Sequence, residues 1–293
     1  MKKLLIFLLF SSSAILLPLL SSADSLIIRA GGSTTLLPII SKCASDFMEK
    51  YKTWDHVNQR MPPKDIVIFI TGGGSSFGVK SLIDGTVDIG LASRELKDKE
   101  KSMLKQYKTF LVGKDAVVIA TSKANPIAKV KDDFTKKELA DIFSGAQNTY
   151  KSINTSLPNQ PVVLLVRDSG AGSTEMLQSI IMSDKLISPK ALQLPSQGAL
   201  LKKLETNNSA ICYISSGLAL DNKNLKIFSL EGVYPSQENV INGSYAFTRP
   251  LLMIVKENYG NMAGAFIDYV LEEGQKIVSE LNYVPIKNLD NTK

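Results

Sequence analysis

The sequence is poor in cysteine, histidine and tryptophan. Its 293 residues include two cysteines, one histidine and one tryptophan. Two cysteines cannot build a disulfide framework, and a single histidine leaves no cluster with the spacing of metal ligands. Cys43 lies on the apolar face of an expected helix, and Cys212 lies within the apolar run AICYIS. We therefore expect two buried free thiols, no metal site and no cofactor.

Long apolar runs are also absent after the first residues. Lys2 and Lys3 precede an apolar stretch that continues to Leu20, and small residues follow up to Ala23. This order is typical of a secretory signal peptide, here residues 1–23 with cleavage near Ala23. No later run approaches the ~18 residues of a membrane span. The sequence predicts an exported, soluble, periplasmic protein.

Charge is nearly balanced, with 34 basic and 28 acidic side chains and a formal net charge of +6. Two of the lysines belong to the expected signal peptide, so the surplus on the mature chain is smaller still. The basic residues are scattered, without the arginine-rich run or interleaved aromatics of a nucleic-acid groove. This pattern predicts no nucleic-acid partner.

Three times, an apolar strand-like run leads into a loop of Gly, Ser and Thr that opens a helix-like pattern. The runs SLIIRA (25–30), DIVIFI (65–70) and PVVLLVR (161–167) lead into GGSTT, TGGGSSFG and DSGAGSTE. Unbroken apolar strands alternating with helices favour parallel sheets covered on both faces, an α/β architecture. Ligands collect beyond the carboxyl ends of such strands, where the three loops are expected.

The length favours two lobes rather than one core. Two further strand-like segments, 115–126 and 244–255, fit as crossings between the lobes. With these crossings, lobe one comprises residues 24–114 and 243–293, and lobe two comprises residues 115–242.

The second loop also contains a possible catalytic motif. Gly74 to Gly78 reads Gly-Ser-Ser-Phe-Gly and fits the G-x-S-x-G elbow of hydrolases, with Ser76 as the nucleophile. A serine nucleophile needs a base, and His56 precedes Ser76 within a polar segment that is typical of a surface connection. The same loop fails as a nucleotide-binding P-loop, because Val79 separates Gly78 from Lys80.

The property that all three loops share is anion binding. Free N–H groups at a helix N-terminus carry the positive end of the helix dipole, glycine admits a close approach, and Ser and Thr add hydroxyl donors. Arg94 follows the run VDIGLAS, and Arg167 ends the strand before the third loop. Arginine offers charge and paired donors that suit phosphate. We expect the loops to converge on one small oxyanion.

An ordered set of motifs carries a family resemblance. The segments AGGSTTLLPI, ITGGGSSFG, DGTVDIGLASRELKDKE, GKDAVVIATSKANPIA, RDSGAGSTE, AICYISSG, YAFTRPLLMIV and GQKIVSELNYVPI together resemble the periplasmic phosphate-binding proteins of the PstS-like family. The resemblance covers nearly all the mature chain. It implies a two-lobed type II periplasmic binding-protein fold with a hinge of two crossing strands. It also implies that the protein captures inorganic phosphate and delivers it to the membrane permease of an ABC importer.

Residue by residue, the resemblance implies ligand roles in the three loops. The implied phosphate-binding residues are Thr34, Thr35, Ser75, Arg94, Arg167, Ala171, Gly172 and Ser173. The third loop departs from the family's usual Gly-Ser-Gly-Thr, because Ala171 has no hydroxyl and Ser173 replaces threonine. One lost neutral hydrogen bond costs about 0.5–1.5 kcal/mol.

Discrimination against sulfate requires an acceptor for the phosphate proton. Some relatives have an aspartate where this chain has Arg94, so we expect Asp115, beside a crossing, to be that acceptor, with Asp168 in reserve. The alternatives are the same fold binding sulfate or molybdate, a serine esterase or phosphatase, and a surface role with a protein partner. We expect a monomeric binding protein without enzymatic activity.

Overall fold

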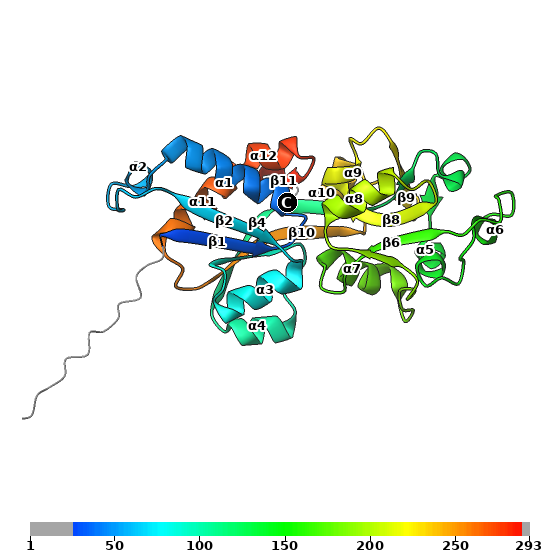
Figure 1. Ribbon diagram of the computed structural model, residues 1–293, viewed down its shortest axis with the longest axis horizontal. Helices are drawn as coiled ribbons and strands as arrows, with labels where there is room; N and C mark the ends of the chain where they lie inside the picture. The colour runs from blue at the N-terminus through cyan, green and yellow to red at the C-terminus, as the bar shows by residue number, and fades with distance from the viewer. Residues whose placement is uncertain (1–25, 289–293) are drawn as a thin grey trace, which may run out of the picture.

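The computed structural model describes residues 26–288, so the predicted signal peptide lies outside the described residues. The strands are β1 (Ile27–Gly32), β2 (Val67–Gly72), β3 (Ile89–Ala92), β4 (Tyr107–Ser122), β5 (Asp133–Phe134), β6 (Val163–Arg167), β7 (Leu192–Leu194), β8 (Ala210–Ser215), β9 (Leu225–Leu230), β10 (Thr248–Lys256) and β11 (Val284–Pro285). Eight of them form a continuous path in the order β2-β1-β3-β10-β4-β8-β6-β7. The path runs along the elongated molecule, and helices cover both of its faces (Figure 1).

One end of the molecule, which we call lobe one, is built on the parallel strands β1, β2 and β3 with antiparallel β10. Its helices are α1 (Leu37–Tyr51), α2 (Trp54–Val57), α3 (Ser75–Asp84), α4 (Asp98–Leu104), α11 (Asn261–Leu271) and α12 (Gln275–Glu280). In Figure 1, α1 and α12 lie on one side of the sheet, and α3 and α4 lie on the other. The apolar face predicted for the first helix is buried there as Ile39, Ile40, Cys43 and Phe47.

The other end, lobe two, is built on the parallel strands β6, β7 and β8 with antiparallel contacts from β4. Its helices are α5 (Lys136–Phe143), α6 (Tyr150–Ile153), α7 (Gly172–Leu177), α8 (Gln197–Glu205), α9 (Ser216–Ala219) and α10 (Gln237–Ile241). A hydrophobic core drawn from Ala116 to Phe247, together with Val284, fills this lobe, whereas the core under α1 draws on segments before Ala116 and after Phe247. The predicted α/β architecture is confirmed.

Strand β4 passes through both lobes. Its first ten residues, 107–116, pair with β10, and Val117 to Ser122 pair with β8 and β9. The segment before β10 returns beside it, because the N–H of Val117 donates to the carbonyl oxygen of Phe247 at 2.8 Å. The two segments expected as crossings therefore lie side by side between the lobes. The boundaries at residues 114/115 and 242/243 stay a prediction.

The strand-loop-helix units place the three polar loops where the lobes meet. Strand β1 leads into α1, β2 leads into α3, and β6 leads into α7. Because β1 and β2 are parallel neighbours, their carboxyl ends lie at the same edge of the sheet. Helix α3 sits tightly on that edge, since a Cβ atom at Gly78 would lie 2.6 Å from the carbonyl oxygens of both Gly31 and Leu91.

Both cysteines are buried and free, which confirms that prediction. Burial raises the pKa of the Cys43 thiol to about 12, so the thiol stays protonated and unreactive at neutral pH. Among residues 26–288, no helix combines the length and apolar character of a membrane span.

The packing of α3 gives a test of the fold. We expect Gly78→Ala to lower the free energy of unfolding by about 1–3 kcal/mol, because the new methyl group meets backbone oxygens that cannot turn aside. Gly264→Ala in α11 is the matched control, since its Cβ atom would meet only the Tyr259 ring at 3.4 Å. Urea unfolding followed by circular dichroism measures both variants. Equal stability of Gly78→Ala and the parent chain would contradict this packing.

Candidate anion-binding site

The three polar loops meet in a small pocket between the lobes. The walls of this pocket lie so close together that no water-sized space remains between them in this closed arrangement. Among the described residues, its lining contains two arginines and no acidic side chain. The lining residues are Ser33, Thr34, Thr35, Gly74, Ser75, Ser93, Arg167, Ala171, Gly172, Ser173, Gln197 and Arg249.

Seven of the nine residues singled out from the sequence line this pocket. They come from the first loop, the second loop and the third loop, and they are Thr34, Thr35, Ser75, Arg167, Ala171, Gly172 and Ser173. The structure does not place Arg94 or Asp115 in the lining. The three loops found in the sequence therefore line one pocket, whereas the two charged residues predicted outside them lie elsewhere.

The threonine hydroxyls of the first loop are held as donors toward the pocket. Thr34 Oγ1 accepts a hydrogen bond from Arg167 Nη1 at 2.7 Å, and Thr35 Oγ1 accepts one from Arg249 Nη2 at 2.9 Å. A hydroxyl has one proton and two lone pairs. Because an arginine occupies a lone pair of each oxygen, the proton of each hydroxyl stays available for an acceptor in the pocket.

The serine hydroxyls of the other two loops have the same arrangement. Ser75 Oγ accepts a hydrogen bond from the backbone N–H of Ser93 at 3.0 Å, and Ser173 Oγ accepts one from Gln197 Nε2 at 3.2 Å. Both serines are buried. The proton of the Ser173 hydroxyl remains available, and the Ser75 hydroxyl keeps its proton for the pocket when Ser93 Oγ, 3.4 Å away, is the donor of the pair. Four hydroxyls from two lobes can therefore donate to one small acceptor.

The backbone of the third loop adds further donors. Gly172 and Ser173 are the first two residues of α7, so their N–H groups have no carbonyl one turn earlier within the helix. The N–H of Ala171, also expected to bind the ligand, donates instead to the carbonyl oxygen of Asp168 at 3.1 Å. The loop therefore offers two backbone N–H groups to the pocket.

Glycine is required at position 172 because the lobes touch there. A Cβ atom on Gly172 would lie 2.8 Å from Ser75 Oγ and 2.8 Å from both the carbonyl oxygen and Oγ of Ser93. Those two serines belong to lobe one, whereas Gly172 belongs to lobe two. The structure is thus closed around the pocket.

Arg167 is fixed by contacts on both sides of the pocket. Its side chain is buried and donates to the carbonyl oxygens of Leu194 and Pro195, to Asp168 Oδ2 at 2.9 Å and to Thr34 Oγ1. A guanidinium has five N–H donors, and these bonds occupy four of them. One N–H of Nη1 is left on the side of the pocket.

Asp115 lies behind the pocket wall and is bonded to Arg249. Its Oδ2 accepts from Arg249 Nε and Nη2 at 2.9 and 2.7 Å, and both side chains are fully buried. Its Oδ1 accepts from the hydroxyls of Ser215 and Ser216 and from the N–H of Ser216. Both carboxylate oxygens are therefore occupied by donors of the protein, which leaves Asp115 poorly placed to accept a proton from a ligand.

Asp168, the reserve choice for an acceptor, does not line the pocket. Its Oδ2 accepts from Arg167 and its Oδ1 accepts from the N–H of Gly170 at 3.1 Å. It orients the arginine and the loop that follows β6.

Arg94 lies on the neighbouring surface where the lobes touch. Its guanidinium makes a two-pronged pair with Glu100 of its own lobe at 2.7 and 2.8 Å. Its Nε lies 2.6 Å from Glu175 Oε2 of lobe two, as an ion pair without hydrogen-bond alignment. Lys97 Nζ lies 3.0 Å from the other oxygen of Glu175, to which Ser76 Oγ also donates. Arg94 thus belongs to a cluster that bridges the lobes outside the pocket.

The pair with Arg94 also changes the acidity of Glu100. Burial by itself raises the pKa of this carboxyl, but hydrogen bonds from Arg94 and from the N–H of Lys97 outweigh it and lower the pKa below its ordinary value. The stability that Glu100 contributes is therefore present at neutral pH and is lost as the pH falls through this lowered pKa.

Ser76, the apparent nucleophile, is not paired with the histidine His56. Its hydroxyl donates to Glu175 at 2.9 Å and accepts from Arg94 Nη2 at 3.1 Å. His56 is exposed on α2, where its Nδ1 lies 2.9 Å from the carbonyl oxygen of Tyr51. Ser76 and His56 are therefore engaged with separate partners in separate parts of lobe one.

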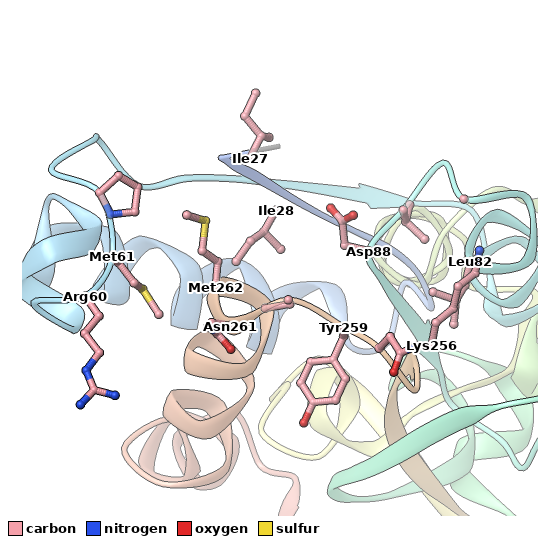
Figure 2. A pocket seen from close by; sticks show the side chains of 16 residues that line it. Ile27, Ile28, Arg60, Met61, Leu82, Asp88, Lys256, Tyr259, Asn261 and Met262 are labelled. Carbon is pink, nitrogen blue, oxygen red and sulfur yellow. The ribbon is translucent and has the colours of Figure 1, made fainter. Parts of the chain in front are cut away.

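A wider pocket lies at the opposite end of β1, near Ile27 and Ile28 (Figure 2). Figure 2 shows an apolar floor beside the charged side chains Arg60, Asp88 and Lys256. The Asp88 carboxylate accepts from the N–H of Arg29 at 2.7 Å and presents negative charge. The mixed charge of this pocket suits a small anion less well than the pocket between the lobes.

Sequence reasoning missed five residues of the lining, one of which is Gly74 in the second loop, next to Ser75. Ser33 and Ser93 stand beside residues that were singled out, in GGST and LASR, and Gln197 carries no signal in the sequence. Arg249 does carry one, because it is a charged residue at the start of the apolar strand TRPLLMIVK. A charge in a buried strand calls for a partner or a ligand.

The comparisons with known proteins agree with this geometry. Residues 20–273 match the profile of a PBP superfamily domain. The phosphate-binding protein PstS of Staphylococcus epidermidis is 30% identical over 266 residues, which cover 86% of this chain and 77% of that protein. PstS of Staphylococcus aureus USA300 is 28% identical over 269 residues, which cover 87% of this chain and 77% of that protein.

Solved structures show the same fold. The crystal structure of a phosphate ABC transporter substrate-binding protein from Clostridium perfringens, with bound phosphate, has a TM-score of 0.75 at 28% identity, covering 88% of this chain and 99% of that one. The structure of an ABC-type phosphate transport receptor from Vibrio cholerae has a TM-score of 0.68 at 22% identity. It covers 88% of this chain and 99% of that one, and at this identity it supports the fold alone. Both likenesses span the two lobes described above.

The fold is that of the type II periplasmic binding proteins, two α/β lobes joined by crossing strands around an enclosed pocket. Within that class, the chain belongs to the PstS-like family of phosphate-binding proteins.

The contact at Gly172 yields a test of closure. We expect Gly172→Ala to disfavour the closed form by about 1–3 kcal/mol, roughly tenfold or more, because the methyl group pushes Ser75 and Ser93 away. Small-angle X-ray scattering with inorganic phosphate added should then give a larger radius of gyration than the parent chain.

Gly170→Ala in the same loop is the control for that experiment, since its Cβ atom would meet Asp168 Oδ1 and Ser76 Cβ at 3.4 and 3.5 Å. We expect this variant to remain as compact as the parent chain. A compact Gly172→Ala would contradict the close contact between the lobes.

Proposed function

We propose that this protein is an extracytoplasmic receptor that captures inorganic phosphate between its lobes and delivers it to the permease of an ABC importer. The observation that carries the proposal is the state of the four pocket hydroxyls. Thr34, Thr35, Ser75 and Ser173 each accept a hydrogen bond from an N–H group of the protein. Each therefore keeps a proton for a ligand that only accepts, as a dehydrated oxyanion does.

Charge supports an anion as the ligand. Arg167 and Arg249 line the pocket, and hydrogen bonds between charged donors and phosphate are among the stronger ones in proteins. The proposed ligand set is Thr34, Thr35, Ser75, Arg167, Gly172 and Ser173.

Capture by closure follows from the distribution of these groups over both lobes. Thr34 and Ser75 belong to lobe one, and Arg167 and Ser173 belong to lobe two. An anion that contacts all of them favours the closed form over an open one, which is the hinge motion of this class of receptor. We infer no enzymatic role, because Ser76 is bonded to the ion-paired Glu175 and to Arg94 rather than to a histidine.

Another oxyanion is the second candidate, and one observation favours it. The lining has no carboxylate among the described residues, and Asp115 is saturated with donors. A site built from donors alone also suits sulfate or molybdate, which carry no proton to give. The relatives described above, which are phosphate-binding proteins, favour phosphate.

Location and partners follow from the family. Residues 1–23 fit a secretory leader, and export places the receptor outside the cytoplasmic membrane. We propose that it acts as a monomer, because each lobe must move freely to open and close, and that the permease docks across the mouth of the closed lobes.

Isothermal titration calorimetry tests the proposal. The mature chain, residues 24–293, is stripped of bound anion by partial unfolding and refolding, and phosphate, sulfate and molybdate are titrated separately near neutral pH. We expect stoichiometric binding of phosphate at least about a hundredfold tighter than sulfate, near 2.7 kcal/mol. If sulfate or molybdate binds more tightly than phosphate, that ion becomes the assigned ligand. If none of the three anions binds, the receptor hypothesis is wrong.

A further inference from the structure

Arg249 is an unusual member of the pocket because part of its guanidinium has no partner. Its Nε and Nη2 atoms donate to Asp115 and Thr35, whereas its Nη1 atom is buried and has no hydrogen-bond partner among the described residues. The residue as a whole is 2% exposed, and its side chain is fully buried. Leaving a buried charged donor unsatisfied costs more than leaving a neutral one. A group of this kind calls for a ligand that accepts.

The position of Arg249 in the fold is equally specific. Arg249 on β10 and Asp115 on β4 are opposite each other in the antiparallel register, so the ion pair joins the two crossing strands. Asp115 also accepts from Ser215 and Ser216 at the start of α9 in lobe two, and Arg249 donates to Thr35 in lobe one. The pair therefore contacts both lobes at the point where they join.

A tyrosine completes this network behind the pocket. Tyr283 donates to the carbonyl oxygen of Thr35 at 3.1 Å and accepts from Ser215 Oγ at 3.3 Å. Its hydroxyl is buried, and burial together with the nearby Asp115 raises its pKa, so it remains a donor at physiological pH. Thr35, Arg249, Asp115 and Ser215 are thus held in one ring of hydrogen bonds.

We propose that Arg249 is a further anion-binding residue, which donates through Nη1 to the bound oxyanion, and that Asp115 is its positioning partner. This inference rests on the proposed function and adds a residue that the sequence pattern did not assign. Asp115 holds the Nε and Nη2 side of the guanidinium, so Nη1 is the nitrogen left without a partner on a residue that lines the pocket. The anion then bonds directly to the junction of the crossing strands, where its arrival can stabilise the closed arrangement of both lobes.

The role proposed for Asp115 differs from that of a proton acceptor. An acceptor in contact with phosphate would improve binding of the protonated anion alone. A carboxylate that positions Arg249 improves binding of every oxyanion that reaches the pocket. Asp115→Asn is therefore expected to weaken the binding of phosphate and the binding of sulfate by similar factors. A loss of affinity for phosphate alone would overturn the positioning role.

The main test compares phosphate binding by the mature parent chain with binding by Arg249→Gln and Arg249→Lys in calorimetry. We expect Arg249→Gln to bind phosphate at least about tenfold more weakly, because the amide lacks the charge and the free N–H pair. Arg249→Lys should also lose affinity, because one ammonium group cannot replace the planar fork that serves both Asp115 and the ligand. Arg60→Gln removes the same charge from an exposed position and should bind like the parent chain.

Three outcomes separate the possibilities. A folded Arg249→Gln that binds phosphate within twofold of the parent chain overturns the inference and leaves the proposed function intact. No phosphate binding by the parent chain overturns both. If the Arg249 variants fail to fold, the crystal structure of the parent chain with phosphate decides. We expect Nη1 within hydrogen-bond distance of a phosphate oxygen, and Nη1 bonded only to water or protein overturns the inference.

Discussion

An anion held away from water must be surrounded by donors that have no competing use, and the rest of this structure depends on that constraint. A serine or threonine hydroxyl is an acceptor as readily as a donor, so it must be fixed in the donor role. Here Thr34 and Thr35 are fixed by arginines, and Ser75 and Ser173 are fixed by an amide N–H and a glutamine. These supporting groups are buried and bonded to the framework, which gives the pocket its preference before any ligand enters.

The closed arrangement of the lobes brings these donors together. The donors are divided between lobes that touch at Gly172, and an ion-pair cluster around Arg94 and Glu175 bridges the surfaces next to the pocket. The side chains of Arg94 and Glu175 are largely buried, at 7% and 16% exposure, so this ion pair belongs to the closed arrangement of the lobes. The firm connection lies at the crossing strands, where Asp115 and Arg249 are fully buried.

The amino-acid pattern was sufficient to predict the α/β class, the three loops and most of the pocket, because Gly, Ser and Thr after apolar strands have a local physical meaning. The charged residues were harder to place, because their partners are distant in the sequence. Arg94 looked like a ligand and is paired with glutamates, one of them 81 positions away in lobe two. Asp115 looked like a proton acceptor and is saturated by Arg249, 134 positions away. Gln197 could not have been found, since only the tertiary fold brings it to Ser173.

Hydrogen–deuterium exchange, measured by mass spectrometry with and without inorganic phosphate, tests the central claim most directly. The account predicts slower exchange in peptides that contain each of the three loops, near residues 33–36, 74–77 and 171–174, because donors of both lobes converge on one anion and closure removes water from them. Peptides of α2 and α6, far from the pocket, should exchange at unchanged rates. Protection confined to one lobe, or none in any loop, would contradict enclosure of the anion between the lobes.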